Sequence, residues 1–217
     1  MKIWIQYNFG MEHFIYRNIV IIFDSSLSSQ FIKLSNLINN YFSSQIVLNE
    51  NDSIPHLTLY TTKYPKKYEG KIINHLEKFA EKQKSFDLVL TKKSFVVGTI
   101  FLDASLTPEL KKLHYDVVDL LNPFRDGIYD PMELKLPGLT KEMKKSLIEL
   151  GMWAAKDLYI PHVSIARPIK ELSGEKCLSL LPNKINYFSH ISAIHYVETG
   201  TNGTCKRIIE SFPFGRI

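Results

Sequence analysis

Two six-residue segments of this chain repeat one pattern of side chains. Residues 54–59 and 160–165 both read apolar, proline, histidine, apolar, hydroxyl, apolar. Side chains alternate between the two faces of a β-strand, so each histidine shares a face with the hydroxyl two residues later, while the aliphatic residues face the other way. The predicted pairs are His56 with Thr58 and His162 with Ser164.

Imidazole and hydroxyl side chains in this arrangement point to acid–base chemistry. An unperturbed imidazole has a pKa of about 6.5, so it can accept or donate a proton near neutral pH. A hydroxyl can donate a hydrogen bond to an oxygen on which negative charge develops. A single histidine in an apolar strand usually only packs, but here the same His-x-hydroxyl arrangement occurs twice after Ile-Pro. The remaining histidines lack this context: His13, His75, His114, His190 and His195.

Two residues beyond the motifs are candidates for binding a ligand. Tyr60 has the same parity as His56 and Thr58, so its ring either stacks on a base or packs against a neighbouring strand. The guanidinium of Arg167 could bind a phosphate through two hydrogen bonds. Strict alternation places Arg167 on the opposite face, however, so it reaches a ligand only if the strand bends or ends before it.

The chain is moderately basic, with a formal net charge of +5 over 217 residues. This balance fits an anionic ligand, and it fits equally a lysine-rich surface that aids solubility. Four basic residues lie in or beside the predicted hairpins, where they could line an entrance but are better explained as solvated turn charges: Lys92, Lys93, Lys206 and Arg207.

The sequence offers no recognisable metal site. His56 and His162 could together hold zinc, but a catalytic zinc usually takes three protein ligands and no third is evident. The chain has no His-Glu-x-x-His motif, and Cys177 and Cys205 form no Cys-x-x-Cys pair. We therefore expect a metal-independent site without a cofactor.

The sequence shows no feature of export or membrane insertion. Its first residues lack the apolar run of a signal peptide, and no stretch approaches the roughly 20 apolar residues of a membrane span. Two cysteines do not support a disulfide framework, and they fit a reducing compartment. We expect a cytoplasmic protein with no membrane partner.

Short β-branched runs alternate with helical periodicity, which predicts an α+β protein with mostly antiparallel sheets. Thr107 before Pro108 and Thr140 are typical of helix starts, and Gly151 is typical of a helix end. The predicted helices follow caps at Ser28 or Ser29, Thr107 and Thr140, span 70–81, and begin at Ser173. The predicted strands are 19–23, 54–61, 86–90, 95–102, 159–166, 191–198 and 206–212, with turns at 91–94 and at Asn202 and Gly203.

The paired motifs resemble those of the 2H phosphoesterase superfamily, which includes the LigT-like RNA ligase/cyclic phosphodiesterase proteins. The second motif continues from His162 as His-Val-Ser-Ile-Ala-Arg, which is close to the His-x-Thr-Leu-Ala-Arg form common in that branch. The predicted hairpin 86–102, the helix after Thr107 and the terminal hairpin also fall where that family places them. The resemblance therefore spans roughly residues 19–214.

The resemblance implies a duplicated α+β fold. Two pseudo-symmetric lobes, each an antiparallel sheet with helices outside, would face a central cleft, and each would supply one motif from opposite sides of the substrate. Residues 1–217 would then form one domain of two lobes. Residues 126–156 would be an insertion before the second motif, serving as a lid, as a gauge of substrate length or as a peripheral packing helix.

The resemblance also implies a metal-independent phosphodiesterase that hydrolyses a 2′,3′-cyclic phosphate or a 2′–5′ phosphodiester of a nucleotide or RNA end. His56 and His162 would share the acid and base roles, in an order that the sequence leaves open, and Thr58 and Ser164 would bind the non-bridging oxygens. The alternatives are an RNA- or nucleotide-binding module without useful turnover and a 3′-end RNA exonuclease. No obligate protein partner is evident.

Overall fold

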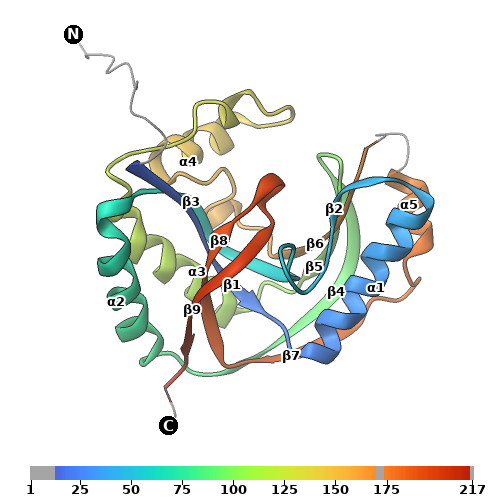
Figure 1. Cartoon of the computed structure of the whole chain (residues 1–217), viewed down its shortest axis with the longest axis horizontal. Coiled ribbons are helices and arrows are strands. Elements are labelled where there is room, and N and C mark those ends of the chain that lie inside the picture. Colours follow the sequence, from blue (N-terminus) through green and yellow to red (C-terminus); the bar gives the residue numbers. More distant parts are fainter. Residues whose placement is uncertain (1–12, 170–173, 216–217) are drawn as a thin grey trace.

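The computed structural model describes residues 13–169 and 174–215. Within them, nine strands form one antiparallel sheet in the order β7-β4-β5-β6-β3-β1-β8-β9, and β2 pairs with β6. Figure 1 shows this sheet strongly curled, with α2 and α3 outside one half and α1 and α5 outside the other. The predicted α+β class, with antiparallel strands and helices outside, is confirmed. The strands are β1 (Phe14–Ile22), β2 (Ser44–Val47), β3 (His56–Pro65), β4 (Phe86–Val96), β5 (Thr99–Ala104), β6 (His162–Pro168), β7 (Tyr187–Ile191), β8 (Ala193–Thr199) and β9 (Cys205–Pro213).

The helices pack against one face of the sheet, which we call the core face. They are α1 (Ser25–Tyr41), α2 (Glu69–Ala80), α3 (Pro108–Leu121), α4 (Lys141–Leu150) and α5 (Gly174–Leu180). Leu57 and Val163, the residues after the two motif histidines, are fully buried on the core face in a single large hydrophobic cluster. The opposite face, called the open face below, carries the motif side chains His56, Thr58, His162 and Ser164.

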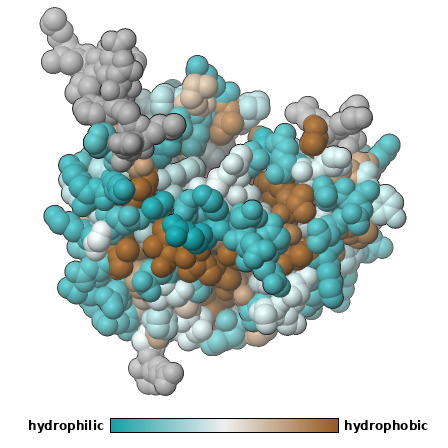
Figure 2. All heavy atoms as spheres, viewed as in Figure 1, coloured by the Kyte–Doolittle hydropathy of each residue, from teal (hydrophilic) through white to brown (hydrophobic). Residues whose placement is uncertain are grey.

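The outer surface follows from this layering. In the space-filling view of Figure 2, hydrophobic side chains gather mainly across the middle of the molecule, and hydrophilic ones surround them. A helix that buries its apolar stripe against a sheet leaves its polar stripe facing solvent, which accounts for hydrophilic side chains on the outer surface. Among the described residues, no helix combines the length and apolar character that crossing a bilayer would demand.

Both motif strands begin at the motif histidine. β3 starts at His56 and β6 starts at His162, whereas the predicted strands began at residues 54 and 159. Pro55 and Pro161 stand directly before them. Proline has no N–H to donate to a strand ladder, so regular pairing starts only after it.

The helix ends follow their capping residues. The Thr107 and Thr140 hydroxyls accept hydrogen bonds from Leu110 N and Met143 N, each at 3.2 Å, as predicted. Gly151 ends α4 at a φ of 70°, also as predicted. The predicted helix α1 is present, but its predicted cap at Ser28 or Ser29 is wrong. Its cap is Asp24, whose Oδ1 accepts from Leu27 N at 3.0 Å, because β1 ends just before this carboxylate and the helix starts at once.

The predicted turn at residues 91–94 is also wrong. β4 continues through these residues, and the chain reverses at Val97 and Gly98, which have φ values of 49° and 77°. Two adjacent residues at positive φ match the twist of a tight hairpin, and the glycine adopts this conformation without steric cost. The polar side chains of residues 91–94 look like a turn in the sequence, but they lie on a paired strand.

This longer strand changes the interpretation of Lys93. Its Nζ donates hydrogen bonds to the carbonyls of Leu178 at 2.8 Å and of Leu181 and Pro182 at 3.0 Å. These carbonyls lie at and just beyond the end of α5, where the helix dipole is negative. Lys93 is therefore a structural residue on the core face, and not a solvated turn charge.

Two strands went unpredicted, and one predicted helix start cannot be placed. β2 has only four residues and β7 has five, so neither shows a clear period of two. The turn of the terminal hairpin at Asn202 and Gly203 is confirmed, with φ values of 58° and 75°. α5 is described from Gly174, and the predicted start at Ser173 lies outside the described residues.

The segment 126–156 is fastened to the sheet at the carboxyl end of α4. The guanidinium of Arg125, which is 2% exposed, donates to the carbonyls of Ile148 at 3.2 Å and Glu149 at 2.7 Å, and also to that of Ile128. Tyr60 Oη donates to the carbonyl of Leu150 at 2.6 Å. The last carbonyls of α4 thus receive their donors from outside the helix, which favours a packing helix over a mobile lid.

We predict that Arg125→Leu destabilises the fold. The change removes three partly buried hydrogen bonds to backbone carbonyls, each worth on the order of 1 kcal/mol, so the free energy of unfolding should fall by about 3 kcal/mol. Urea unfolding followed by circular dichroism measures this loss. The control is Arg207→Leu, which removes an exposed partner of Glu198 and should change the free energy by less than about 1 kcal/mol. Equal effects of the two substitutions would contradict the anchoring role.

Candidate active site

The two motif strands are neighbours at the centre of the sheet. β3 and β6 pair antiparallel, with Leu57 opposite Val163. In this register each motif histidine lies beside the hydroxyl residue of the other motif, on the open face. The four motif side chains are therefore brought together within one sheet, whereas the resemblance implied two strands facing each other across the substrate. The adjacent pairs are His56 with Ser164 and Thr58 with His162.

Both motif imidazoles make the same hydrogen bond. His56 Nδ1 bonds the carbonyl of Ile54 at 2.8 Å, and His162 Nδ1 bonds the carbonyl of Ile160 at 2.7 Å. A carbonyl can only accept, so Nδ1 carries the proton in each ring and Nε2 carries the lone pair. Within the described residues, neither Nε2 has a hydrogen-bond partner. Each ring is thus fixed in position and leaves Nε2 available to accept or donate a proton.

The peptides that orient the rings are themselves held in place. Ile54 N–H donates to the carbonyl of Cys205 at 2.9 Å, which ties the start of β3 to the start of β9. The carbonyl of Pro161 accepts from Ala104 N–H at 2.9 Å, which ties the start of β6 to β5. Each imidazole is therefore positioned by a strand distant in the sequence.

Burial lowers the pKa of both imidazoles. Desolvation lowers the pKa of His56 to about 4, against an opposing hydrogen bond from the Ile54 carbonyl, and the charge of a protonated His162 lowers it further. Desolvation also lowers the pKa of His162, while the Ile160 carbonyl and the Asp103 carboxylate oppose this shift. The electrostatic effect of His162 on His56 agrees with two rings that share one site.

The hydroxyl of Thr58 is oriented by a buried amide. Asn18 Nδ2, on β1, donates to Thr58 Oγ1 at 2.9 Å, and Asn18 is only 1% exposed. Because Thr58 Oγ1 accepts this bond, its own proton is free to be donated to another oxygen. Ser164 has no hydrogen-bond partner within the described residues, so its hydroxyl is also available.

A β-bulge follows each motif and reverses the later side chains. On β3, Ile19 and Val20 of β1 pair with Tyr60 and Thr58, so Leu59 is the extra residue. On β6, Ile100 and Phe101 of β5 pair with Ala166 and Ser164, so Ile165 is the extra residue. In both strands the alternation of faces shifts by one residue after the hydroxyl.

The predicted face of Tyr60 is therefore wrong, and of the two roles left open for its ring, packing against neighbours is the one that the structure bears out. The bulge turns Tyr60 to the core face, where it is fully buried and its hydroxyl caps α4. A ring in this position cannot stack on a base. The same shift turns Arg167 to the open face, although strict alternation placed it on the other side. Arg167 is partly exposed and has no hydrogen-bond or ion-pair partner within the described residues, so its charge is available to an anion.

Three residues of this site carried no signal in the sequence. Asn18 reaches Thr58 only through the pairing of β1 with β3. On β5, Phe101 stacks on the ring of His162, with centroids 3.8 Å apart, and Asp103 pairs with His162 in the ladder. Only the order of strands in the sheet brings these residues to the motifs.

His114 is structural, in agreement with its lack of a motif. Its Nδ1 donates to the carbonyl of Leu59 at 2.6 Å, and its Nε2 accepts from Lys156 N–H at 2.7 Å. The ring stacks on Tyr159, whose hydroxyl donates to the carbonyl of Thr58 at 2.7 Å. These donors satisfy the carbonyls of β3 at its bulge and thereby hold the end of the first motif.

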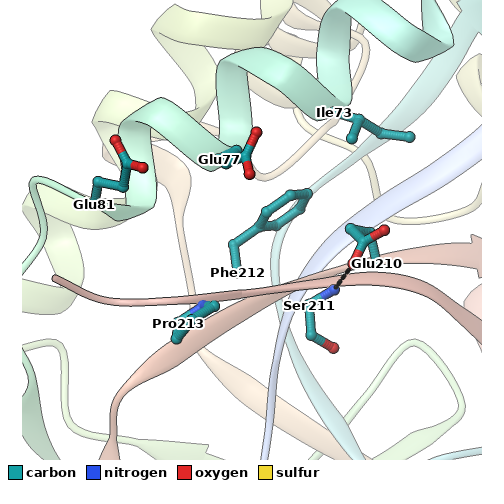
Figure 3. A pocket seen from close by; sticks show the side chains of 7 residues that line it. All are labelled: Ile73, Glu77, Glu81, Glu210, Ser211, Phe212 and Pro213. Atoms are coloured by element: carbon teal, nitrogen blue, oxygen red, sulfur yellow. Dashed lines mark hydrogen bonds between the residues drawn. The ribbon is translucent and has the colours of Figure 1, made fainter.

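The described residues contain no group of three or more histidine, cysteine or carboxylate side chains that could hold a metal ion. One hollow lies apart from the motifs, between α2 and β9 (Figure 3). Its carboxylates, Glu77, Glu81 and Glu210, would repel a phosphate, so this hollow does not suit an anionic ligand. The residues that line it are Ile73, Glu77, Glu81, Glu210, Ser211, Phe212 and Pro213.

We predict that folding stability falls as the pH drops from about 6.5 to 4. Burial lowers the pKa of His114 to about 4, so below pH 6.5 the unfolded chain binds a proton that the folded chain excludes. His114→Gln keeps one donor and one acceptor but does not titrate, so its free energy of unfolding should depend less on pH. Urea unfolding at several pH values measures this. An unchanged pH dependence in the variant would contradict the role given to His114.

Neither a model of a known protein family nor a curated protein sequence matches this chain. Solved structures match it along its length. E. coli LigT complexed with 3′-AMP gives a TM-score of 0.60 at 12% identity, over 94% of this chain and 99% of that chain. TT0787 of Thermus thermophilus gives 0.56 at 12% identity, over 94% and 100%. A further phosphoesterase gives 0.52 at 10% identity, over 93% and 99%. The chain has the fold of the LigT-like 2H phosphoesterases.

Proposed function

We propose that this protein is a metal-independent phosphodiesterase that hydrolyses a 2′,3′-cyclic phosphate or a 2′–5′ phosphodiester of a nucleotide or RNA end. The observation that supports this most is the matched state of His56 and His162. Both rings have a protonated Nδ1 bound to a backbone carbonyl and a free Nε2, and both belong to neighbouring strands of one sheet. Two such imidazoles suit the paired proton transfers of a displacement at phosphorus.

The proposed reaction uses the open-face side chains in distinct roles. One imidazole takes the proton of the attacking oxygen, and the other donates a proton to the oxygen that leaves. Thr58 and Ser164 donate hydrogen bonds to the non-bridging oxygens, whose charge grows in the transition state. Arg167 adds a positive charge on the same face and can bind the phosphate through two N–H groups. No step of this scheme requires a metal or a cofactor.

A nucleotide is the favoured substrate class. The net charge of +5 suits an anionic ligand. LigT, which shares this fold, has been solved in complex with 3′-AMP and, at a TM-score of 0.53 and 10% identity, with NADP+. A binding module without turnover would have no use for two matched imidazoles with free Nε2 atoms. Cys177 and Cys205 are both free thiols in the core, which fits the expected cytoplasmic location.

We predict that His56→Ala and His162→Ala each lower kcat by about 10²- to 10⁴-fold, because each removes one partner in proton transfer. The assay follows a 2′,3′-cyclic mononucleotide and a 2′–5′ dinucleotide, with and without EDTA, and EDTA should have no effect. The control is His190→Ala, at an exposed position on edge strand β7, which should retain full activity. Full activity in either motif variant would refute the shared acid–base scheme.

We also predict opposite outcomes for substitutions at Tyr60 and Arg167, the two residues that the bulges turn to the face opposite the predicted one. Arg167→Gln removes a charged hydrogen bond to phosphate, worth about 1.5–3 kcal/mol, so kcat/KM should fall roughly 10- to 150-fold. Tyr60→Phe removes the hydrogen bonds of the hydroxyl to Leu150 and, at 3.5 Å, to Asn122, so it should lower stability by about 1 kcal/mol and leave kcat/KM nearly unchanged. A large kinetic loss in Tyr60→Phe, with none in Arg167→Gln, would reverse our assignment.

A further inference from the structure

The two motifs are alike within their strands but differ in their cross-strand neighbours. On the open face, His162 pairs with Asp103 of β5, whereas His56 pairs with Ile22 of β1. The hydroxyl residues differ in the same way, since Ser164 pairs with Phe101 and Thr58 pairs with Val20. The imidazole of the second motif therefore has a carboxylate and an aromatic ring beside it, while that of the first has aliphatic side chains.

The carboxylate of Asp103 is held in place beside His162. Its Oδ1 accepts a hydrogen bond from Ser94 Oγ on β4 at 2.9 Å. Phe101 stacks on the His162 ring, at 3.8 Å between centroids and 27° between planes, and this contact adds to the Nδ1 hydrogen bond in holding the ring. His162 Nδ1 is already bonded to Ile160, and no hydrogen bond joins Asp103 to the ring. Asp103 therefore acts on His162 through its charge, from the directly opposite position on the neighbouring strand.

The other charged groups around His162 do not offset this effect. Lys92 lies opposite Asp103 on β4, but its side chain is exposed to solvent, which screens its charge. Arg167 lies on the same strand beyond the bulge, and His56 on β3 is neutral because its pKa is about 4. For His56 the surroundings are Ile22 and Ile54, which pack with the small cluster around Val20 and supply no negative charge.

We propose that Asp103 makes the two imidazoles unequal, so that His162 is the general acid and His56 is the general base. This inference rests on the proposed function and assigns the two roles within it. Asp103 does not touch the substrate, and it is a positioning residue that acts through His162. The electrostatics agree. Burial lowers the pKa of both rings, but Asp103 opposes this shift for His162, whereas the neighbouring His162 lowers the pKa of His56 further.

The assigned reaction starts with His56 neutral and with His162 protonated on both nitrogens, and its proton inventory balances. His56 Nε2 takes the proton of the attacking oxygen as that oxygen forms its bond to phosphorus. The opposite P–O bond breaks, and the leaving oxygen takes the proton from His162 Nε2. His56 ends protonated and His162 ends neutral, so one proton passes through solvent from His56 to His162 before the next turnover.

The assignment is tested by comparing two substrates whose leaving groups differ in their need for a proton. A 2′–5′ dinucleotide needs a proton on its departing alkoxide, whereas the matching 2′-(4-nitrophenyl) ester releases a stable phenolate that needs none. His162→Ala should lose about 10²- to 10⁴-fold on the dinucleotide and less than about tenfold on the nitrophenyl ester. His56→Ala should lose about 10²- to 10⁴-fold on both. Rescue of His56→Ala by the nitrophenyl ester, with none for His162→Ala, would overturn the assignment.

The role of Asp103 is tested by Asp103→Asn, with Asp87→Asn, an exposed partner of His190, as the control. Removing the charge lowers the pKa of His162, so the alkaline limb of the kcat/KM profile on the dinucleotide should move to lower pH. Activity on the nitrophenyl ester should remain close to that of the wild type. Movement of the acid limb instead, or an unchanged profile, would overturn the proposal. If the wild type cleaves neither of these esters nor a 2′,3′-cyclic mononucleotide, the proposed function itself fails.

Discussion

The hydrogen bond from each motif imidazole to the carbonyl two residues before it is the interaction on which the site depends. It sets the tautomer, so the lone pair lies on Nε2, and it sets the direction of the ring. Pro55 and Pro161 make it possible, because regular pairing begins only after them and leaves the carbonyls of Ile54 and Ile160 free for the rings. With the other tautomer, Nε2 could not act as a base.

Side-chain alternation within a strand is a local property, and it predicted the two His-hydroxyl pairs correctly. Alternation failed for Tyr60 and Arg167. Each lies on the face opposite the predicted one, because an extra residue follows each motif. A bulge depends on which residues of the neighbouring strand form the ladder, and neither β1 nor β5 is adjacent to its partner in the sequence. The same reason hid Asn18 and Asp103, which reach the motifs only through the strand order.

Helix ends were predicted correctly where a single capping residue determines them. Thr107, Thr140 and Gly151 begin and end their helices as expected, because a cap needs only the residues of one turn. The hairpin at Val97 and Gly98 was missed because a polar stretch of β4 resembles a turn. The role of the segment 126–156 could not be predicted from its own residues either. Its attachment depends on Arg125 and Tyr60, and neither lies in the segment.

The central claim is that two imidazoles in the same tautomer act on one phosphorus. The most direct test is the imidazole nitrogen NMR spectrum of the full chain, recorded with and without inorganic phosphate. We expect Nδ1 of His56 and His162 to be protonated in both spectra, and both Nε2 signals to shift when phosphate binds. An Nδ1 without a proton in either ring of the free protein, or a phosphate response from only one of the two rings, would contradict the account.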